Sequence, residues 1–296
     1  FEFFIFFRLL QASIAAGFLM SRVIIRDITS ENEAASMIGY VTMGMSIIPL
    51  FAPGLGGLIQ MLLGWPSIFL IMSLLGLLLL LLVFRDLGET KIKKNKNTKS
   101  SASFINLFWE AKFWGYSFTL AFSAGTFFSF LGGAPYVATK VYNLNSVVSG
   151  LVMGFPAAGY FIGNYLSGRY SKFYGIDYMA LRGILLVIFG MFICLVITVF
   201  YRDTPYFFFG LCSFVGLGNG LIIPNASVGI LSVNENLSGT AGGIGNAIMI
   251  GTGAILASLT SYYLENQTSS SYLVFIMLLS GALSYTSLYI FVLRNK

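Results

Sequence analysis

The chain has 296 residues, of which 57% are hydrophobic and only 9% are charged. Soluble domains carry roughly 25% charged residues, so this composition excludes an ordinary soluble fold and indicates an all-α polytopic membrane protein. The chain contains no histidine, which excludes His-based metal sites and Ser-His nucleophile pairs. We therefore expect no metal, no cofactor and no enzyme activity. We attribute the net charge of +6 to membrane topology and anionic lipid, and we expect no nucleic acid partner.

Apolar runs long enough to cross a bilayer, about 20 helical residues each, predict nine membrane spans. They occupy residues 3–25, 37–62, 66–84, 113–137, 147–168, 179–200, 205–231, 240–262 and 272–293. The one long polar segment, residues 85–111, is rich in Lys, Asn and Ser and is expected to be a flexible linker. We therefore expect three spans in residues 1–84 and six in residues 112–296.

The distribution of Lys and Arg predicts the orientation of these spans. When the linker is placed in the cytoplasm, nearly all basic residues, including Arg22 and Arg26, fall on the cytoplasmic side. On the extracellular side the pattern leaves only Lys140 and Arg202. This positive-inside pattern predicts a multi-pass protein whose linker and C-terminus are cytoplasmic.

Arg8 is the one basic residue that lies well inside a predicted span. A charge at that depth is costly, and its side chain either reaches back to the headgroups or faces a water-filled cavity or a carboxylate. We favour the cavity, and we place Gln11, one turn further on, beside Arg8 on its wall. No carboxylate in the nine spans is placed deeply enough to compensate Arg8, so we expect its partner on a part of the protein outside this sequence.

The second predicted span has one face of small or kink-forming residues. In the order of the chain these are Gly39, Thr42, Ser46, Pro49, Pro53, Gly56, Gly57 and Gln60. Since small residues let helix backbones approach closely in lipid, we expect this face to pack tightly against another helix. The two prolines remove backbone donors and should bend the outer half of the span.

Other spans carry small residues, amides and rings. Glycines at four-residue spacing in 147–168, and a small stripe from Gly242 through Asn246 in 240–262, predict close helix packing, whereas the plainer span 179–200 is expected to face lipid. Buried amides need partners, so Asn219, Asn225 and Asn246 either bond between helices or line a cavity. We assign Asn219 and Asn246 to a transport cavity, together with the ring of Phe122.

The segments FFRLLQASIAAG and SIIPLFAPGLGG, followed by the basic linker, resemble the fourth to sixth spans of the major facilitator superfamily. More narrowly, they resemble the bicyclomycin-resistance family of drug:proton antiporters. The resemblance implies a helical bundle of two halves, with three spans of the N-terminal half and six of the C-terminal half in this chain. It matches Arg8 and Gln11 to a motif of the fourth helix. It also matches an antiporter motif of the fifth helix, expected to seal the extracellular end, to Pro49, Pro53, Gly54, Gly56 and Gly57.

The chain also departs from this family. The first three spans are absent, and with them the acidic residue of the first helix that many of these antiporters use to carry protons. The segment from Gly163 to Gly175 corresponds to a basic loop of the family and keeps Gly168, Arg169 and Lys172, but it lacks the acidic member.

We therefore predict a secondary active transporter that exports small drug-like compounds in exchange for protons, a multidrug efflux or antibiotic-resistance activity. It would work as a monomer in the bacterial inner membrane, by alternating access. A membrane enzyme and a channel fit less well, because we find neither a nucleophile-base pair nor a charged filter ring. The remaining alternative is a truncated, non-transporting remnant of such a transporter.

Overall fold

The computed structural model describes residues 2–11, 14–64, 66–86, 104–201, 203–234, 237–265 and 269–294. Every longer regular element in these ranges is a helix. In chain order they are α1 (Glu2–Gln11), α2 (Ile14–Ile28), α3 (Glu31–Leu63), α4 (Pro66–Asp86), α5 (Phe104–Trp109), α6 (Ala111–Tyr136), α7 (Ser146–Val152), α8 (Phe155–Tyr174), α9 (Ile176–Phe200), α10 (Pro205–Ser232), α11 (Ser238–Leu264) and α12 (Ser271–Leu288). Short π-helical turns, η1 (Val137–Val141) and η3 (Tyr289–Leu293), extend α6 and α12.

Among the described residues, six helices are long and apolar enough to cross a membrane. They are α4, α6 with η1, α9, α10, α11, and α12 with η3. The expected run 3–25 is divided between α1 and α2, and the expected run 147–168 is divided between α7 and α8. The helical membrane fold is therefore confirmed, but the count of nine spans is not.

The break between α7 and α8 has a local cause. Pro156 lies in the first turn of α8, where its missing N–H leaves no hydrogen bond unmade. Further along a continuous helix, its ring would clash with the carbonyl of Val152, the last residue of α7. The prediction of one helix over 147–168 was wrong because Pro156, nine residues after residue 147, favours a new helix start.

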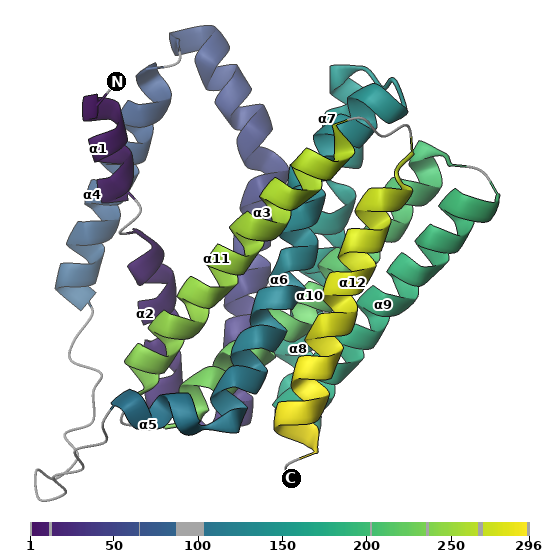
Figure 1. Cartoon of the computed structure of the whole chain (residues 1–296). Coiled ribbons are helices and arrows are strands. Elements are labelled where there is room, and N and C mark those ends of the chain that lie inside the picture. The colour runs from purple at the N-terminus through teal and green to yellow at the C-terminus, as the bar shows by residue number, and fades with distance from the viewer. Residues whose placement is uncertain are drawn as a thin grey trace, which may run out of the picture.

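Helices α6 to α12 form one bundle, and α10 lies at its centre (Figure 1). Helix α10 packs against α6, α8 and α9, while α11 and α12 pack mainly against α6. Helix α3 runs along α8, whereas α1 and α4 stand to the side of the bundle. The main contacts of α4 are with α3, and no residue of α4 is buried.

The crossing of α8 and α10 is made by glycines. A Cβ added at Gly159 or Gly163 would overlap the backbone of α10, and one added at Gly216 would overlap the backbone of α8 at Pro156. The two backbones therefore touch, as the four-residue spacing of these glycines predicted.

Helix α9 corrects another expectation. The sequence predicts that it faces lipid, yet a Cβ added at Gly183 would lie 2.7 Å from the carbonyl oxygen of Gly218 on α10. Val187 and Met191 are buried on the same side. Because α9 is apolar all round, its sequence does not mark a buried face, and the partner helix decides which side is covered.

Candidate functional site

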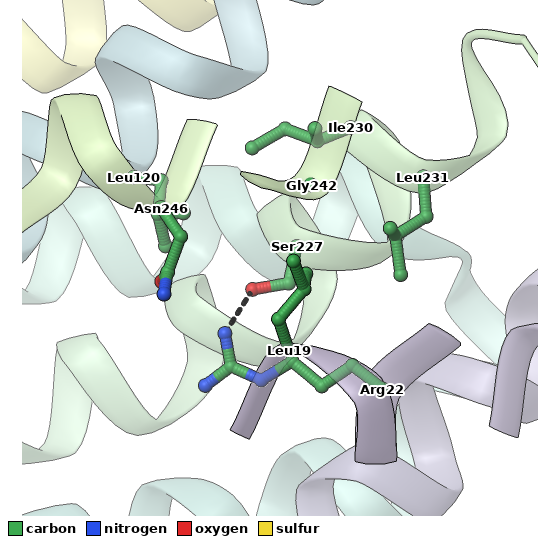
Figure 2. Close-up of a pocket in the computed structure, with 8 residues that line it drawn as sticks. All are labelled: Leu19, Arg22, Leu120, Ser227, Ile230, Leu231, Gly242 and Asn246. Atoms are coloured by element: carbon green, nitrogen blue, oxygen red, sulfur yellow. Dashed lines mark hydrogen bonds between the residues drawn. The ribbon is translucent and has the colours of Figure 1, made fainter. Parts of the chain in front are cut away.

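Two arginines of α2 join it to α10, about 200 residues away along the chain. The Nη1 atom of Arg22 donates a hydrogen bond to Oγ of Ser227 at 3.0 Å, drawn in Figure 2. One turn further along α2, Nε of Arg26 donates to Oγ of Ser232, also at 3.0 Å. Both acceptors are neutral hydroxyls, so these bonds can be made and broken at less cost than buried ion pairs.

A small pocket lies beside the Arg22 guanidinium, between α2, α6, α10 and α11. Its lining consists of Leu19, Arg22, Leu120, Ser227, Ile230, Leu231, Gly242 and Asn246. Figure 2 shows the guanidinium of Arg22 and the amide of Asn246 directed into the same space. The space has room for about a single water molecule, so α2 is packed closely against α10 and α11 here.

Helices α3 and α8 meet through small residues. A Cβ added at Gly39 would lie 2.6 Å from the amide nitrogen of Gly168, and one added at Gly168 would lie 2.8 Å from the ring of Tyr40. The hydroxyl of Ser36 donates to the carbonyl oxygen of Gly168. Gly39, Thr42 and Ser46 are buried along this seam, which confirms the predicted packing face over its described part.

These contacts lie at one end of the bundle, which we call the contact end. It comprises the end of α2, the start of α3, the ends of α8 and α10, and the start of α11. From there, α11 and α1 diverge toward the top of Figure 1. Segments from the two predicted halves, residues 1–84 and 112–296, are thus joined at the contact end.

The buried asparagines differ in their partners. Nδ2 of Asn219 donates to Oγ1 of Thr126 at 3.3 Å, and its Oδ1 accepts from the hydroxyl of Ser123, so both ends of the amide bond α10 to α6. Nδ2 of Asn225 donates to Oγ of Ser167 on α8 at 2.9 Å. Asn219 and Asn225 thus both make inter-helix hydrogen bonds, while Asn246 lines the small pocket. The assignment of Asn219 and Asn246 to a transport cavity stays a prediction.

Phe122 belongs to a row of rings along α6. Trp114 and Phe118 are stacked with centroids 5.3 Å apart, and Phe118 and Phe122 follow at 6.1 Å. Phe122 is half-buried, and its carbonyl oxygen accepts a hydrogen bond of 2.7 Å from Oγ of Ser280 on α12. Its assignment to a transport cavity stays a prediction.

Several predicted site residues lie outside the described side chains. Arg8 lies in α1, but the structure describes only its place in that helix. The same holds in α3 for Pro49, Pro53, Gly54, Gly56 and Gly57. Gln11, the last residue of α1, is exposed. The transport role of Arg8 and Gln11 and the extracellular seal therefore stay predictions.

Residues 1–258 match the Major Facilitator Superfamily. The chain belongs to this family. This family consists of membrane transporters and not of enzymes, and the resemblance found in the motifs of the chain is confirmed.

Several proteins related to this chain carry drug-resistance names. A bicyclomycin resistance protein homolog from Haemophilus influenzae is 28% identical over 253 residues, which cover 83% of the chain and 63% of the relative. Multidrug resistance protein D from Escherichia coli is 26% identical over 274 residues, or 90% of the chain and 67% of the relative. The chain thus spans about two thirds of the length of these relatives.

A solved structure supports the same fold. A bacterial homologue of the iron transporter ferroportin, crystallised in an outward-facing state, matches with a TM-score of 0.67 and 18% identity. The match covers 90% of the chain and 66% of that structure. At this identity the likeness concerns the fold alone.

Sequence reasoning missed the role of Arg22 and Arg26 in this transporter. The positive-inside pattern assigned both to the cytoplasmic surface, but they are half-buried and bonded to α10. Their spacing of four residues on one helix face was the available signal. It could not be interpreted from the sequence, because the acceptors Ser227 and Ser232 lie in a distant helix.

A second polar cluster lies at the opposite end of the bundle. The carboxylate of Asp203, between α9 and α10, accepts from the hydroxyl of Tyr142, from the backbone N–H of Ser270 at 2.9 Å, and from Oγ of Ser269 at 3.0 Å. Burial raises the pKa of Tyr142, so its phenol stays a donor. This cluster ties the loop before α10 to the start of α12.

Proposed function

We propose that the intact protein is a secondary active transporter that exports small drug-like compounds across the bacterial inner membrane in exchange for protons. Membership of the Major Facilitator Superfamily supports transport. The names of the relatives, which include a chloramphenicol resistance protein from Pseudomonas aeruginosa, support drug-like substrates. We further propose that the protein acts as a monomer.

The observation that carries this proposal is the pair of hydrogen bonds from α2 to α10 at the contact end. In alternating access, two bodies rock against each other, so contacts between them must form at one end and open again. We propose that residues 1–84 and 112–296 belong to these two bodies and that residues 85–111 connect them on the cytoplasmic side. Neutral serine acceptors suit contacts that must break in each cycle.

The proposed transport path uses the residues assigned from the sequence. Arg8 and Gln11 would line the cavity from one half, and Phe122, Asn219 and Asn246 from the other. Because both ends of the Asn219 amide already bond to α6, we propose that it holds α6 and α10 in place around the cavity. Pro49, Pro53, Gly54, Gly56 and Gly57 would close the extracellular end by close helix packing.

Proton coupling supplies enough free energy for this export. One proton that moves inward down 100 mV provides about 2.3 kcal/mol, which corresponds to a nearly fifty-fold gradient of a neutral substrate.

Reconstitution of the intact protein into proteoliposomes tests this function. We expect export of chloramphenicol-like compounds that stops when the proton gradient is abolished. Arg8→Ala should abolish export without loss of insertion, and Arg8→Lys should retain little activity because a single ammonium cannot replace the guanidinium fork. The matched control is Arg85→Lys, an exposed arginine in the last turn of α4, which should export normally.

Two outcomes would contradict the proposal. Export that continues after the proton gradient is abolished would exclude proton coupling. Full activity of Arg8→Lys would show that Arg8 only reaches the headgroups. If residues 1–296 alone insert correctly but give no export under any gradient, the chain by itself is a non-transporting remnant.

A further inference from the structure

The corner between α8 and α9 carries a continuous row of aromatic and basic side chains. Tyr170 and Tyr174 on the last turns of α8 have ring centroids 6.2 Å apart. Tyr174 and Tyr178, on the first turn of α9, are stacked with centroids 5.2 Å apart and planes at 25°. The row therefore continues across the helix break at Gly175, whose φ of 81° turns the chain.

An arginine covers each end of this row. Cζ of Arg169 lies 5.8 Å from the ring centroid of Tyr170, and Cζ of Arg182 lies 5.0 Å from that of Tyr178. We call these five residues, Arg169, Tyr170, Tyr174, Tyr178 and Arg182, the tyrosine ladder. Both distances are within the range at which a guanidinium is attracted to an aromatic ring.

The ladder is not part of the protein core. Its three tyrosines are 37%, 58% and 41% exposed, and both arginines are exposed. Within the described residues, both guanidinium groups contact tyrosines: Arg169 lies over Tyr170, and Arg182 lies over Tyr178. Nη1 of Arg169 also donates a hydrogen bond of 3.0 Å to the hydroxyl of Tyr165. The adjacent carboxylate, Asp177, is turned to α6, where it accepts a 2.6 Å hydrogen bond from Tyr116.

We propose that the tyrosine ladder binds the headgroup of an anionic phospholipid. It lies where two helices end, the level at which Tyr and Arg side chains meet the polar headgroups of a bilayer. Guanidinium groups bind phosphate through paired hydrogen bonds, and the stacked rings hold both groups in fixed positions at small entropic cost. The anionic headgroup of phosphatidylglycerol has no ammonium that the two arginines would repel, and this favours it over a zwitterionic headgroup.

This site differs from the general aromatic belt of membrane proteins. Belt residues act one by one, whereas here three rings and two cations are in contact in one row. Lys172, which lies between them in the sequence, is directed elsewhere, over the ring of Phe173 and near Glu33. The proposal therefore concerns the two arginines of the ladder and not basic residues in general.

Native mass spectrometry of the purified protein in detergent tests the proposal. The protein is titrated with short-chain phosphatidylglycerol and, separately, with phosphatidylcholine, and we expect one molecule of phosphatidylglycerol to bind preferentially. The double variant Arg169→Gln/Arg182→Gln should bind it about thirty-fold more weakly, since each basic contact near the surface contributes about 1 kcal/mol. Tyr174→Leu, which keeps an apolar side chain but interrupts the stack, should also weaken binding.

The control removes the same charge elsewhere. Arg85→Gln/Lys112→Gln replaces two exposed basic residues outside the ladder, and it should bind phosphatidylglycerol like the unmodified protein. Thermal unfolding of each variant in detergent confirms that it is folded.

An equal loss in the control variant would overturn the proposal, because it would show attraction to net charge alone. Equal binding of phosphatidylcholine would also overturn it, and so would displacement of the lipid by an acidic peptide, which would indicate a protein partner.

Discussion

Helices α4 and α10 show that the more hydrophobic of two helices need not be the more buried one. Helix α4 is the more apolar of the two, yet none of its residues is buried, whereas more than half of the apolar window of α10 is. In a bilayer the lipid is as apolar as leucine, so a leucine gains little by facing another helix. What brings α10 into the centre is its small and polar residues.

The contacts of α10 are of two kinds. Gly216 and Gly220 allow the backbone of α8 to approach within van der Waals distance, and Asn219 bonds to hydroxyls of α6. Helix α4 has one glycine, Gly76, and nothing would meet a Cβ added there within 4 Å. Matched substitutions in the two helices can therefore test whether small and polar residues, and not hydrophobicity, hold a helix in the bundle.

The largest effect is expected at glycines. Gly216→Leu would place a side chain into the backbone of α8 at Pro156 and should destabilise the protein by about 3 kcal/mol or more, the upper part of the overpacking range. Gly76→Leu in α4 should leave stability unchanged. Thermal unfolding in detergent measures both, and equal melting temperatures for the two variants would contradict the comparison.

The next effect is expected at the buried amide. Asn219→Leu removes both bonds to α6 and leaves the hydroxyls of Ser123 and Thr126 without these partners. Hydrogen bonds inside membrane proteins contribute about 0.6 to 1.7 kcal/mol each, so we expect a loss of about 1 to 3 kcal/mol in an unfolding titration with SDS. Ser73→Ala in α4, where the hydroxyl bonds only to its own helix at Phe69, is the control and should change little.

A smaller effect is expected where α10 meets α2. Ser227→Ala removes the acceptor for Arg22, and one bond of about 0.6 kcal/mol corresponds to a change of nearly threefold in an equilibrium. A Cβ added at Gly242 would lie 2.6 Å from the Leu19 side chain. Cysteines introduced at these two positions therefore report the contact between α2 and α11 through the rate at which they form a disulfide. We expect Ser227→Ala to slow it by roughly that factor. An unchanged rate would mean that packing alone holds the contact end.

The smallest effect is expected from a surface charge, because an exposed carboxylate contributes little to the stability of the fold. Ser30 donates from Oγ to Glu33 at 2.7 Å at the start of α3, and this bond lowers the pKa of Glu33 below its ordinary value of 4.5. A lowered carboxyl pKa stabilises the fold above the ordinary value, and this contribution is lost as the pH falls through the folded pKa. Glu33→Gln should therefore flatten a slight decrease of melting temperature below pH 4.5, because it lowers the neutral value by the same slight amount and leaves the acidic value unchanged. A large loss at pH 7 would contradict this.

Much of this protein can be derived from local patterns in its sequence. Hydropathy alone identifies a polytopic helical protein, and the Pro- and Gly-containing segments with the basic linker identify the family. The spacing of Gly159 and Gly163 predicts a tight crossing, because small side chains have that consequence whatever helix they meet.

The tertiary structure decided what depends on distant partners. The sequence of α9 is apolar on all sides, so only the position of α10 determines which face is buried. The partners of the Asn219 and Asn225 amides are hydroxyls on α6 and α8, which the sequence does not identify. Arg22 and Arg26 resemble cytoplasmic anchors in sequence, and only the fold places Ser227 and Ser232 beside them. Local chemistry determines which residues can form helices and close contacts, but a hydrogen bond between residues 205 positions apart exists only once the chain has folded.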